Sequence, residues 1–260
     1  MQAREAFLIL CLAHLATDFL LQSDAMVKAK KQGRARAYAI HGAIHYAAIV
    51  AVTAGAHPGW LMDLRYQAAG VALIAAHLLI DLAKENLTAK KTGDNVWIFL
   101  ADQGAHLATI AAAALLFTRT RLDALRQWLG ALEPHRDKIL AVLVVYFGVV
   151  FAGGYLIRFL TKPLTRHLPG VEGGSSQSLR NAGMYIGWLE RSLVLTAVLM
   201  HSPATVGLVL AAKSIARFPE MGKSEGFAEY FLIGTLLSLL GAIFGGAFLL
   251  KVLDGTVSLG

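Results

Sequence analysis

The sequence predicts an all-α polytopic membrane protein with about seven to eight transmembrane helices. Of its 260 residues, 56% are hydrophobic and only 16% are charged, and long apolar runs alternate with short basic loops. That pattern is typical of polytopic helical proteins. The net charge of +7 is then expected to mark cytoplasmic loops and lipid headgroup contacts, so we expect membrane lipids and no nucleic acid as partners.

The apolar runs can be placed in order along the chain. Basic loops follow the first and third runs, which puts those loops in the cytoplasm and the amino terminus outside. The seventh run is too short to cross alone, and Ser202-Pro203 before it predicts a helix start, with Ser as N-cap and Pro in the first turn. The predicted runs are 6–22, 37–56, 67–82, 96–117, 139–159, 182–200, 204–215 and 228–250.

The predicted runs divide the chain into three regions. We expect a repeated four-helix bundle over residues 1–118 and an amphipathic linker over 119–137. A carboxy-terminal helical membrane domain with a short or discontinuous helix pair occupies 138–260. A single cysteine, Cys11, excludes an internal disulfide and a thiolate-rich zinc site.

An internal repeat organises the first region. The segment AHLATD (13–18) returns as AHLLID (76–81), and each copy places a His and an Asp four residues apart, on one face of a helix. The next run of each copy carries a second pair with the same spacing, His41 with His45 and Asp102 with His106. Because both units cross the membrane in the same direction, we predict parallel 2+2 repeats about an axis along the membrane normal.

All these polar groups fall in one slab in the cytoplasmic half of the bilayer. A single intramembrane histidine is most often a helix-packing hydrogen bond, worth about 0.6 kcal/mol. Three aspartates in one slab, however, require a cation or protons to neutralise them. We therefore predict a metal site in this slab. Its candidate ligands are His14, Asp18, His41, His45, His77, Asp81, Asp102 and His106.

Imidazole and carboxylate ligands without thiolate favour Zn²⁺, with Fe or Mn as alternatives. Eight ligands exceed one tetrahedral shell, so the set suits either two bridged ions or one ion with a surrounding ring of polar residues. The candidate catalytic carboxylates are Asp18, Asp81 and Asp102. The candidates for outer or substrate contacts are Gln22, Glu85 and Gln103. We interpret Cys11 as core packing.

The carboxy-terminal region carries charges within or beside its apolar runs, namely Glu190, Arg191, Lys213, Arg217 and Glu229. Ion pairs such as Glu190 with Lys213, or Arg191 with Glu229, would hold a discontinuous helix hairpin. Alternatively, the three basic residues would form an anion pocket for a phosphate or carboxylate headgroup. The sequence leaves both interpretations open.

Several motifs resemble a known family. AHLATDFLLQ, HGAIH, AHLLIDLAKE and DQGAH resemble the bacterial membrane family of unknown function DUF3307. GWLERSLVLTAVL, AAKSIARF and AEYFLIGTLLS resemble the carboxy-terminal extension of its long forms. The resemblance covers most of the chain and implies a protein of the bacterial inner membrane, without implying an activity.

Two classes of function suit these residues. The favoured hypothesis is a metal-dependent hydrolase or transferase that acts on a lipid or lipid-linked substrate from the cytoplasmic leaflet, where the basic loop Lys28–Arg36 would recruit anionic lipid. Oxidative di-iron chemistry would use the same ligands. The alternative is a transporter or channel for divalent metal or protons. The almost wholly apolar outer halves of the first four helices favour a one-sided site. A structural or sensory metal protein, and a homo-oligomer, stay open.

Overall fold

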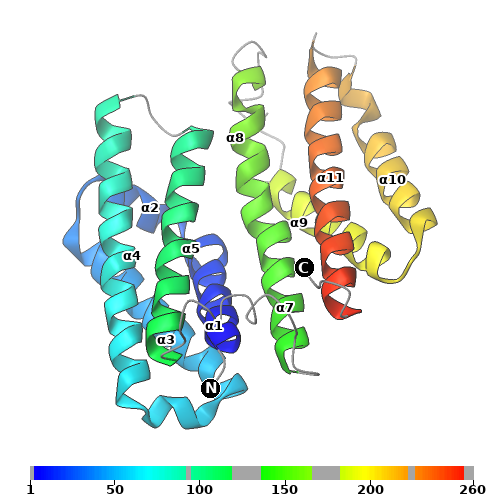
Figure 1. Cartoon of the computed structure of the whole chain (residues 1–260). Helices are drawn as coiled ribbons and strands as arrows, with labels where there is room; N and C mark the ends of the chain where they lie inside the picture. Colours follow the sequence, from blue (N-terminus) through cyan, green and yellow to red (C-terminus); the bar gives the residue numbers. More distant parts are fainter. Residues whose placement is uncertain (1–2, 92–94, 119–135, 166–181, 222–225, 255–260) are drawn as a thin grey trace. The chain divides into compact units, whose positions relative to one another are not determined.

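The computed structural model describes residues 3–91, 95–118, 136–165, 182–221 and 226–254. These residues form helices joined by short turns, and no strand occurs among them (Figure 1). The predicted all-α fold is confirmed. The chain divides into two compact units, Met1–Val144 with Asp254–Gly260, and Val145–Leu253. Most of the predicted linker, residues 119–135, lies outside the described residues, so the three-region division stays a prediction.

The first unit contains a bundle of four long helices. Its elements are α1 (Ala3–Ala16), the π-helical turn η1 (Thr17–Leu21), α2 (Asp24–Lys31), α3 (Ala35–Ala56), the 3₁₀ turn η2 (Pro58–Met62), α4 (Leu64–Lys91) and α5 (Val96–Thr118). Helices α1 and α4 each pack against both α3 and α5. The contacts of α1 are therefore matched by those of α4, as a repeat of two helices would produce. The repeat itself stays a prediction.

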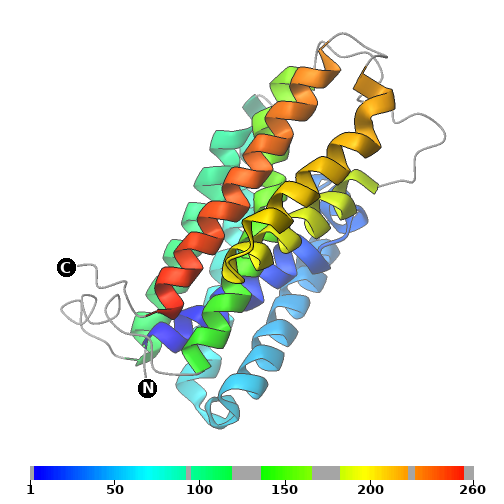
Figure 2. The ribbon, with the colours of Figure 1, turned by 90° about the vertical axis from the view of Figure 1, so that its right-hand side faces the viewer.

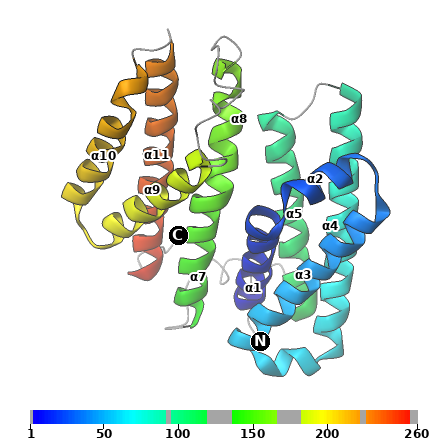
Figure 3. The same cartoon turned by 180° about the vertical axis from the view of Figure 1, so that it is seen from behind.

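Two segments that we predicted as loops are helical. Within the basic loop, α2 begins after Ser23, whose side chain accepts a hydrogen bond from the Met26 amide. The axis of α2 is bent by 93° from that of α1 and η1, and α2 lies across the bundle against α3 and α4 (Figure 3). Helix α4 continues through 83–91 because Leu, Ala, Lys and Glu in this stretch are good helix formers.

Aromatic side chains close one end of the first bundle. Trp60, Tyr66 and Phe117 are buried, and their ring centroids lie 4.8–5.5 Å apart. The imidazole of His57 stacks on Trp60, and its Nε2 atom lies 2.9 Å from Glu5 Oε2. This end of the bundle, where α1 begins and α3 ends, is therefore filled by rings and an ion pair.

The second unit contains most of a long helix and three further helices that pack together (Figure 2). The long helix runs through α7 (Arg136–Phe147), the π-helical turn η4 (Gly148–Ala152) and α8 (Gly153–Thr165), and the second unit begins within it, at Val145. The further helices are α9 (Ala182–Leu199), α10 (Pro203–Met221) and α11 (Phe227–Leu253). Helix α11 packs against α8 and α9, and α9 packs against α10. The start of α10 at Pro203 confirms the helix start that Ser202-Pro203 predicted.

The apolar helices indicate a membrane protein. Five described helices are long and apolar enough to cross a membrane, or six if the bent pair of α1–η1 and α2 forms one span. Large apolar side chains are exposed on them, such as Leu116 at 78% and Phe244 at 69%, as lipid-facing residues would be. The predicted seven to eight spans included α9 and α10, whose apolar character is reduced by charged residues such as Glu190, Arg191 and Lys213.

Glycines allow close packing in the second unit. A Cβ atom added at Gly246 would lie 2.7 Å from Val198 Cγ1 and 2.8 Å from its Cβ. A β-branched side chain is stiff and cannot move aside easily. In contrast, a Cβ atom at Gly241, five residues earlier on α11, would meet nothing within 4 Å. Only part of the predicted glycine-rich helix is thus needed for helix contact.

We expect Gly246→Ala to destabilise the second unit by about 1–3 kcal/mol, because the added methyl group overpacks the contact with Val198. Gly241→Ala is the matched control, and we expect it to stabilise α11 by about 0.5–1 kcal/mol. Reversible unfolding in mixed detergent micelles, followed by circular dichroism, measures both. Equal stabilities of the two variants would show that α9 and α11 are not packed this closely.

Candidate metal centre

Four helices bring all eight predicted ligands into one buried cluster. The side chain of Asp18 is 10% exposed, and the other seven residues are buried. Helix periodicity explains why each helix contributes two of them, since residues four positions apart share a face. The contributing helices are α1 with η1, α3, α4 and α5.

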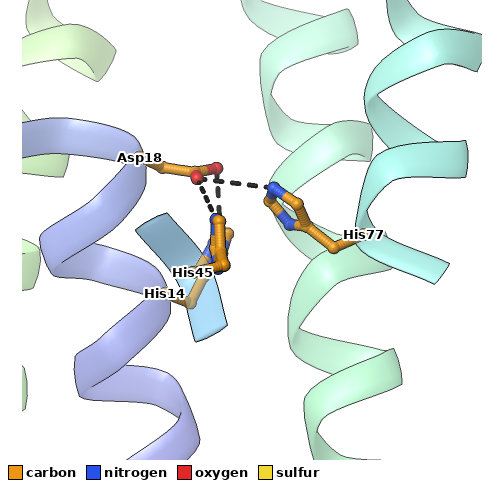
Figure 4. A group of neighbouring side chains, drawn as sticks. All are labelled: His14, Asp18, His45 and His77. Carbon is orange, nitrogen blue, oxygen red and sulfur yellow. Dashed lines mark hydrogen bonds and ion pairs between the residues drawn. The ribbon is translucent and has the colours of Figure 1, made fainter. Parts of the chain in front are cut away.

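Three imidazoles converge on one carboxylate oxygen (Figure 4 draws two of them). From Asp18 Oδ1, the distance is 2.9 Å to His45 Nε2, 3.3 Å to His41 Nε2 and 3.5 Å to His77 Nε2. Asp18 lies in the π-helical turn η1 that ends the first helix, and π-helical turns occur often at functional sites. The described ion-pair contacts of Asp18 are all with imidazoles.

Two sets of four residues could each hold a metal ion, with all ligand atoms of a set within 4.8 Å of one another. The first group is His14, Asp18, His45 and His77. The second group is Asp18, His77, Asp81 and His106. Ligands about 2.0–2.1 Å from a tetrahedral Zn²⁺ lie about 3.3 Å apart, so the Asp18–His45 and Asp18–His77 separations need only small adjustments. His41 and Asp102 lie beside these groups.

Two lysines neutralise two of the three aspartates. The sequence analysis did not predict either ion pair. Lys30 Nζ, from α2, lies 2.5 Å from Asp81 Oδ2. Lys84 Nζ, one turn after Asp81 on α4, lies 2.8 Å from Asp102 Oδ2. These pairs supply part of the positive charge that we attributed to metal or protons. Asp18 forms no ion pair with a described lysine, and its described ion-pair contacts are with imidazoles.

The tautomer of His106 is fixed by its own helix. Its Nδ1 atom lies 2.9 Å from the backbone oxygen of Asp102, which can only accept, so Nδ1 carries the proton. The lone pair is then on Nε2, which is buried and makes no hydrogen bond. Metal-binding histidines are oriented in this way by hydrogen bonding through the other ring nitrogen. The Nε2 atom of His14 is likewise buried without a hydrogen bond. A cation beside these atoms would satisfy them, so the residues present fit a transition-metal ion.

A small cavity adjoins the cluster. Four imidazoles line one part of it, those of His14, His45, His77 and His106. The remaining wall is mainly aliphatic, formed by Leu10, Ile49, Leu73, Ile74, Thr109 and Ile110. It has room for about one water molecule. This space suits an ion or a water but not a lipid acyl chain.

Thr17 is a buried neighbour that the sequence reading missed. Its hydroxyl oxygen lies 2.9 Å from Ala13 O and 3.0 Å from His14 O, so it donates to the helix backbone. The same oxygen lies 3.2 Å from His45 Nδ1 and 2.9 Å from His45 Nε2. A threonine inside an apolar run gives no signal in the sequence, because such residues commonly bond only to their own helix.

The predicted outer residues differ in their contacts. Gln103 Nε2 donates to Asp102 Oδ2 over 2.9 Å. The side-chain nitrogen of Gln22 is buried without a hydrogen bond. Glu85 lies one turn after Asp81 and belongs to neither metal group. Cys11 is buried in the core and likewise belongs to neither group.

In the second unit, Lys213 Nζ lies 2.5 Å from Glu190 Oε2, as one of the suggested ion pairs. Arg191 instead donates from Nε and Nη2 to the backbone oxygen of Val150, at 3.0 and 2.6 Å. The cavity lined by these three charged residues has room for about one water molecule. A headgroup pocket stays a prediction, as do roles for Arg217 and Glu229.

Comparison with protein families finds one match, to a family described as protein of unknown function (DUF3307), over residues 6–130. The matched segment contains the four helices that carry the candidate ligands. Comparison with curated proteins and with solved structures finds no match.

We expect Thr17→Val to weaken metal binding by about 10–100-fold, because loss of the hydroxyl leaves His45 less well oriented. The matched control is Thr53→Val. Thr53 is also buried, but its hydroxyl contacts Ile49 O and Tyr66 Oη at the aromatic end of the bundle. Zinc titration against a competing chelator measures both variants. Equal affinities for the two variants would show that Thr17 has no part in positioning the ligands.

Proposed function

Through residues 6–130 the chain belongs to the DUF3307 family of unknown function, and we propose that it is a membrane metalloprotein with one divalent transition-metal ion in the first group. Zinc is favoured over iron or manganese by the mixture of imidazole and carboxylate ligands. The observation that carries the proposal is the convergence of buried imidazoles on Asp18, a carboxylate that the described lysines leave unpaired.

A single ion suits this arrangement better than two. The two groups share Asp18 and His77, and a neutral imidazole has one lone pair to give to a metal. The remaining carboxylate of the second group, Asp81, is held by Lys30. The first group keeps three imidazoles and one carboxylate without such a competitor.

The reaction class we propose is hydrolysis or group transfer on a lipid or lipid-linked substrate. Bound Zn²⁺ supplies a Lewis acid and an activated water at neutral pH. His41, outside both metal groups, would move the proton. Its Nε2 lies 3.0 Å from His77 Nε2 and 3.3 Å from Asp18 Oδ1, and its Nδ1 makes no hydrogen bond. Asp81 and Asp102, which the sequence also suggested as catalytic carboxylates, would instead hold Lys30 and Lys84 beside the site.

We place the site toward the cytoplasmic leaflet of a bacterial inner membrane, with the amino terminus outside. The support is the charge of the segment around α2, where Lys28, Arg34 and Arg36 are exposed. Basic residues favour the cytoplasmic side and attract anionic lipid headgroups. An anionic lipid gathered there would lie next to η1, the turn that carries Asp18.

The competing function, transport of metal or protons, requires a polar path across the whole bilayer. The far end of the bundle is instead filled by Trp60, Tyr66 and Phe117. The cavity beside the histidines has a mainly aliphatic wall and room for about one water. Both features favour chemistry at one face over passage between two.

We expect detergent-purified protein to contain one equivalent of zinc by mass spectrometry. His14→Ala/His77→Ala should lose it, since two of the four ligands are removed. His57→Ala is the matched control: His57 belongs to the same unit but pairs with Glu5 at the aromatic end, so its removal should leave the zinc content unchanged. Wild-type protein that is purified without chelator, is folded, and contains no metal would overturn the proposal.

The enzyme and transporter hypotheses can be separated in vesicles of phosphatidylethanolamine and phosphatidylglycerol that contain a zinc-sensitive dye. We expect zinc-dependent lipid products, detected by mass spectrometry and lost in Asp18→Asn, without zinc entry. Asp18→Asn removes the only carboxylate of the first group. Zinc entry that depends on Asp18, without any lipid product, would instead establish the transporter.

A further inference from the structure

Lys30 is an unusual feature of the first unit. Its side chain is only 5% exposed although α2 is otherwise a short polar helix. Burying an ammonium group is costly unless the charge is paired. Here the bend after η1 turns α2 back against α4, and Nζ lies 2.5 Å from Asp81 Oδ2. The helix thus delivers a positive charge directly to a residue of the second group.

Apart from the ion pair between Lys30 and Asp81, the second group has the ligands that an ion needs. His106 presents the lone pair of Nε2, which has no hydrogen bond, and its distance to Asp81 Oδ1 is 3.9 Å. Asp18 can give one oxygen to each of two ions, as bridging carboxylates do in sites with metals about 3.5–4 Å apart. The three residues would provide a second ion with an imidazole and two carboxylates.

We propose that Lys30 is a built-in cation that takes the place of a second metal ion. Its ammonium group on Asp81 restricts the centre to one ion, and its removal creates a second metal site formed by Asp18, Asp81 and His106. This inference rests on the proposed metal site in the first group. It adds that the number of ions is set by a lysine of α2.

Lys84 provides a matched control. It also forms an ion pair with a buried aspartate of the cluster, Asp102, at 2.8 Å. Asp102, however, belongs to neither metal group. Loss of Lys84 therefore removes the same charge from the cluster without freeing a carboxylate that can complete the second group.

The test is zinc stoichiometry in the full-length, detergent-purified protein, measured by mass spectrometry after equilibration with Zn²⁺ and removal of unbound ions. We expect one zinc in wild type, in Lys30→Arg, which keeps the cation, and in Lys84→Met. We expect two in Lys30→Met, with affinity for the second ion at least 100-fold higher than in wild type. Lys30→Gln, which can still donate to Asp81 and so is less disruptive, should also bind two.

The outcomes separate this inference from the proposed function. One zinc in both wild type and Lys30→Met overturns the inference and leaves the proposed function standing. Two in wild type, or two in Lys84→Met, also overturns the role of Lys30. No zinc in wild type overturns the proposed function and this inference with it.

One further variant tests the inference if Lys30→Met and Lys30→Gln fail to fold. Lys30→Met/Asp81→Asn removes both partners together, which avoids a buried unpaired charge. We expect it to bind one zinc with wild-type affinity, because the first group is intact. Loss of that zinc would show that the single ion uses Asp81, and would overturn the inference.

Discussion

Charge balance among buried carboxylates is the constraint on which the first unit depends. A carboxylate within an apolar bundle persists only when a cation or several hydrogen-bond donors compensate it. Asp81 and Asp102 are compensated by Lys30 and Lys84, whereas Asp18 is surrounded by imidazoles. The backbone follows from this requirement: a 93° bend is what allows α2 to return a lysine to the bundle. The resulting asymmetry makes Asp18 the natural place for an added cation.

The second unit also contains a buried charge, that of Arg191. The guanidinium group of Arg191 is buried and donates to the backbone oxygen of Val150, inside the π-helical turn η4. Space for it depends on two glycines, since a Cβ atom at Gly154 or Gly187 would lie 2.6 or 3.1 Å from a guanidinium nitrogen. Such a contact ties α9 to the long helix.

Much of this arrangement could be predicted because helical periodicity is visible in a sequence. Apolar runs predicted the long helices, and polar residues four positions apart predicted which side chains share a face. Their partners could not be found in this way. Lys30 reaches Asp81 only because the chain bends after η1, and Lys84 reaches Asp102 only because α4 continues beyond the predicted end at Leu82. Both depend on tertiary geometry, and both looked like ordinary residues of basic loops.

The two ends of the first bundle are built differently, and this difference bears on mechanism. From the level of His14 toward the start of α1, the cavity wall becomes aliphatic, with Leu10 and Ile49, and the bundle then closes on Trp60 and its ring neighbours. An ion leaving the imidazoles in that direction would lose its ligands to an aliphatic wall, at a large desolvation cost. In the opposite direction lie carboxylates, lysines and the polar surface of α2. This asymmetry of the bundle is what the proposed chemistry on a lipid of a single leaflet would require.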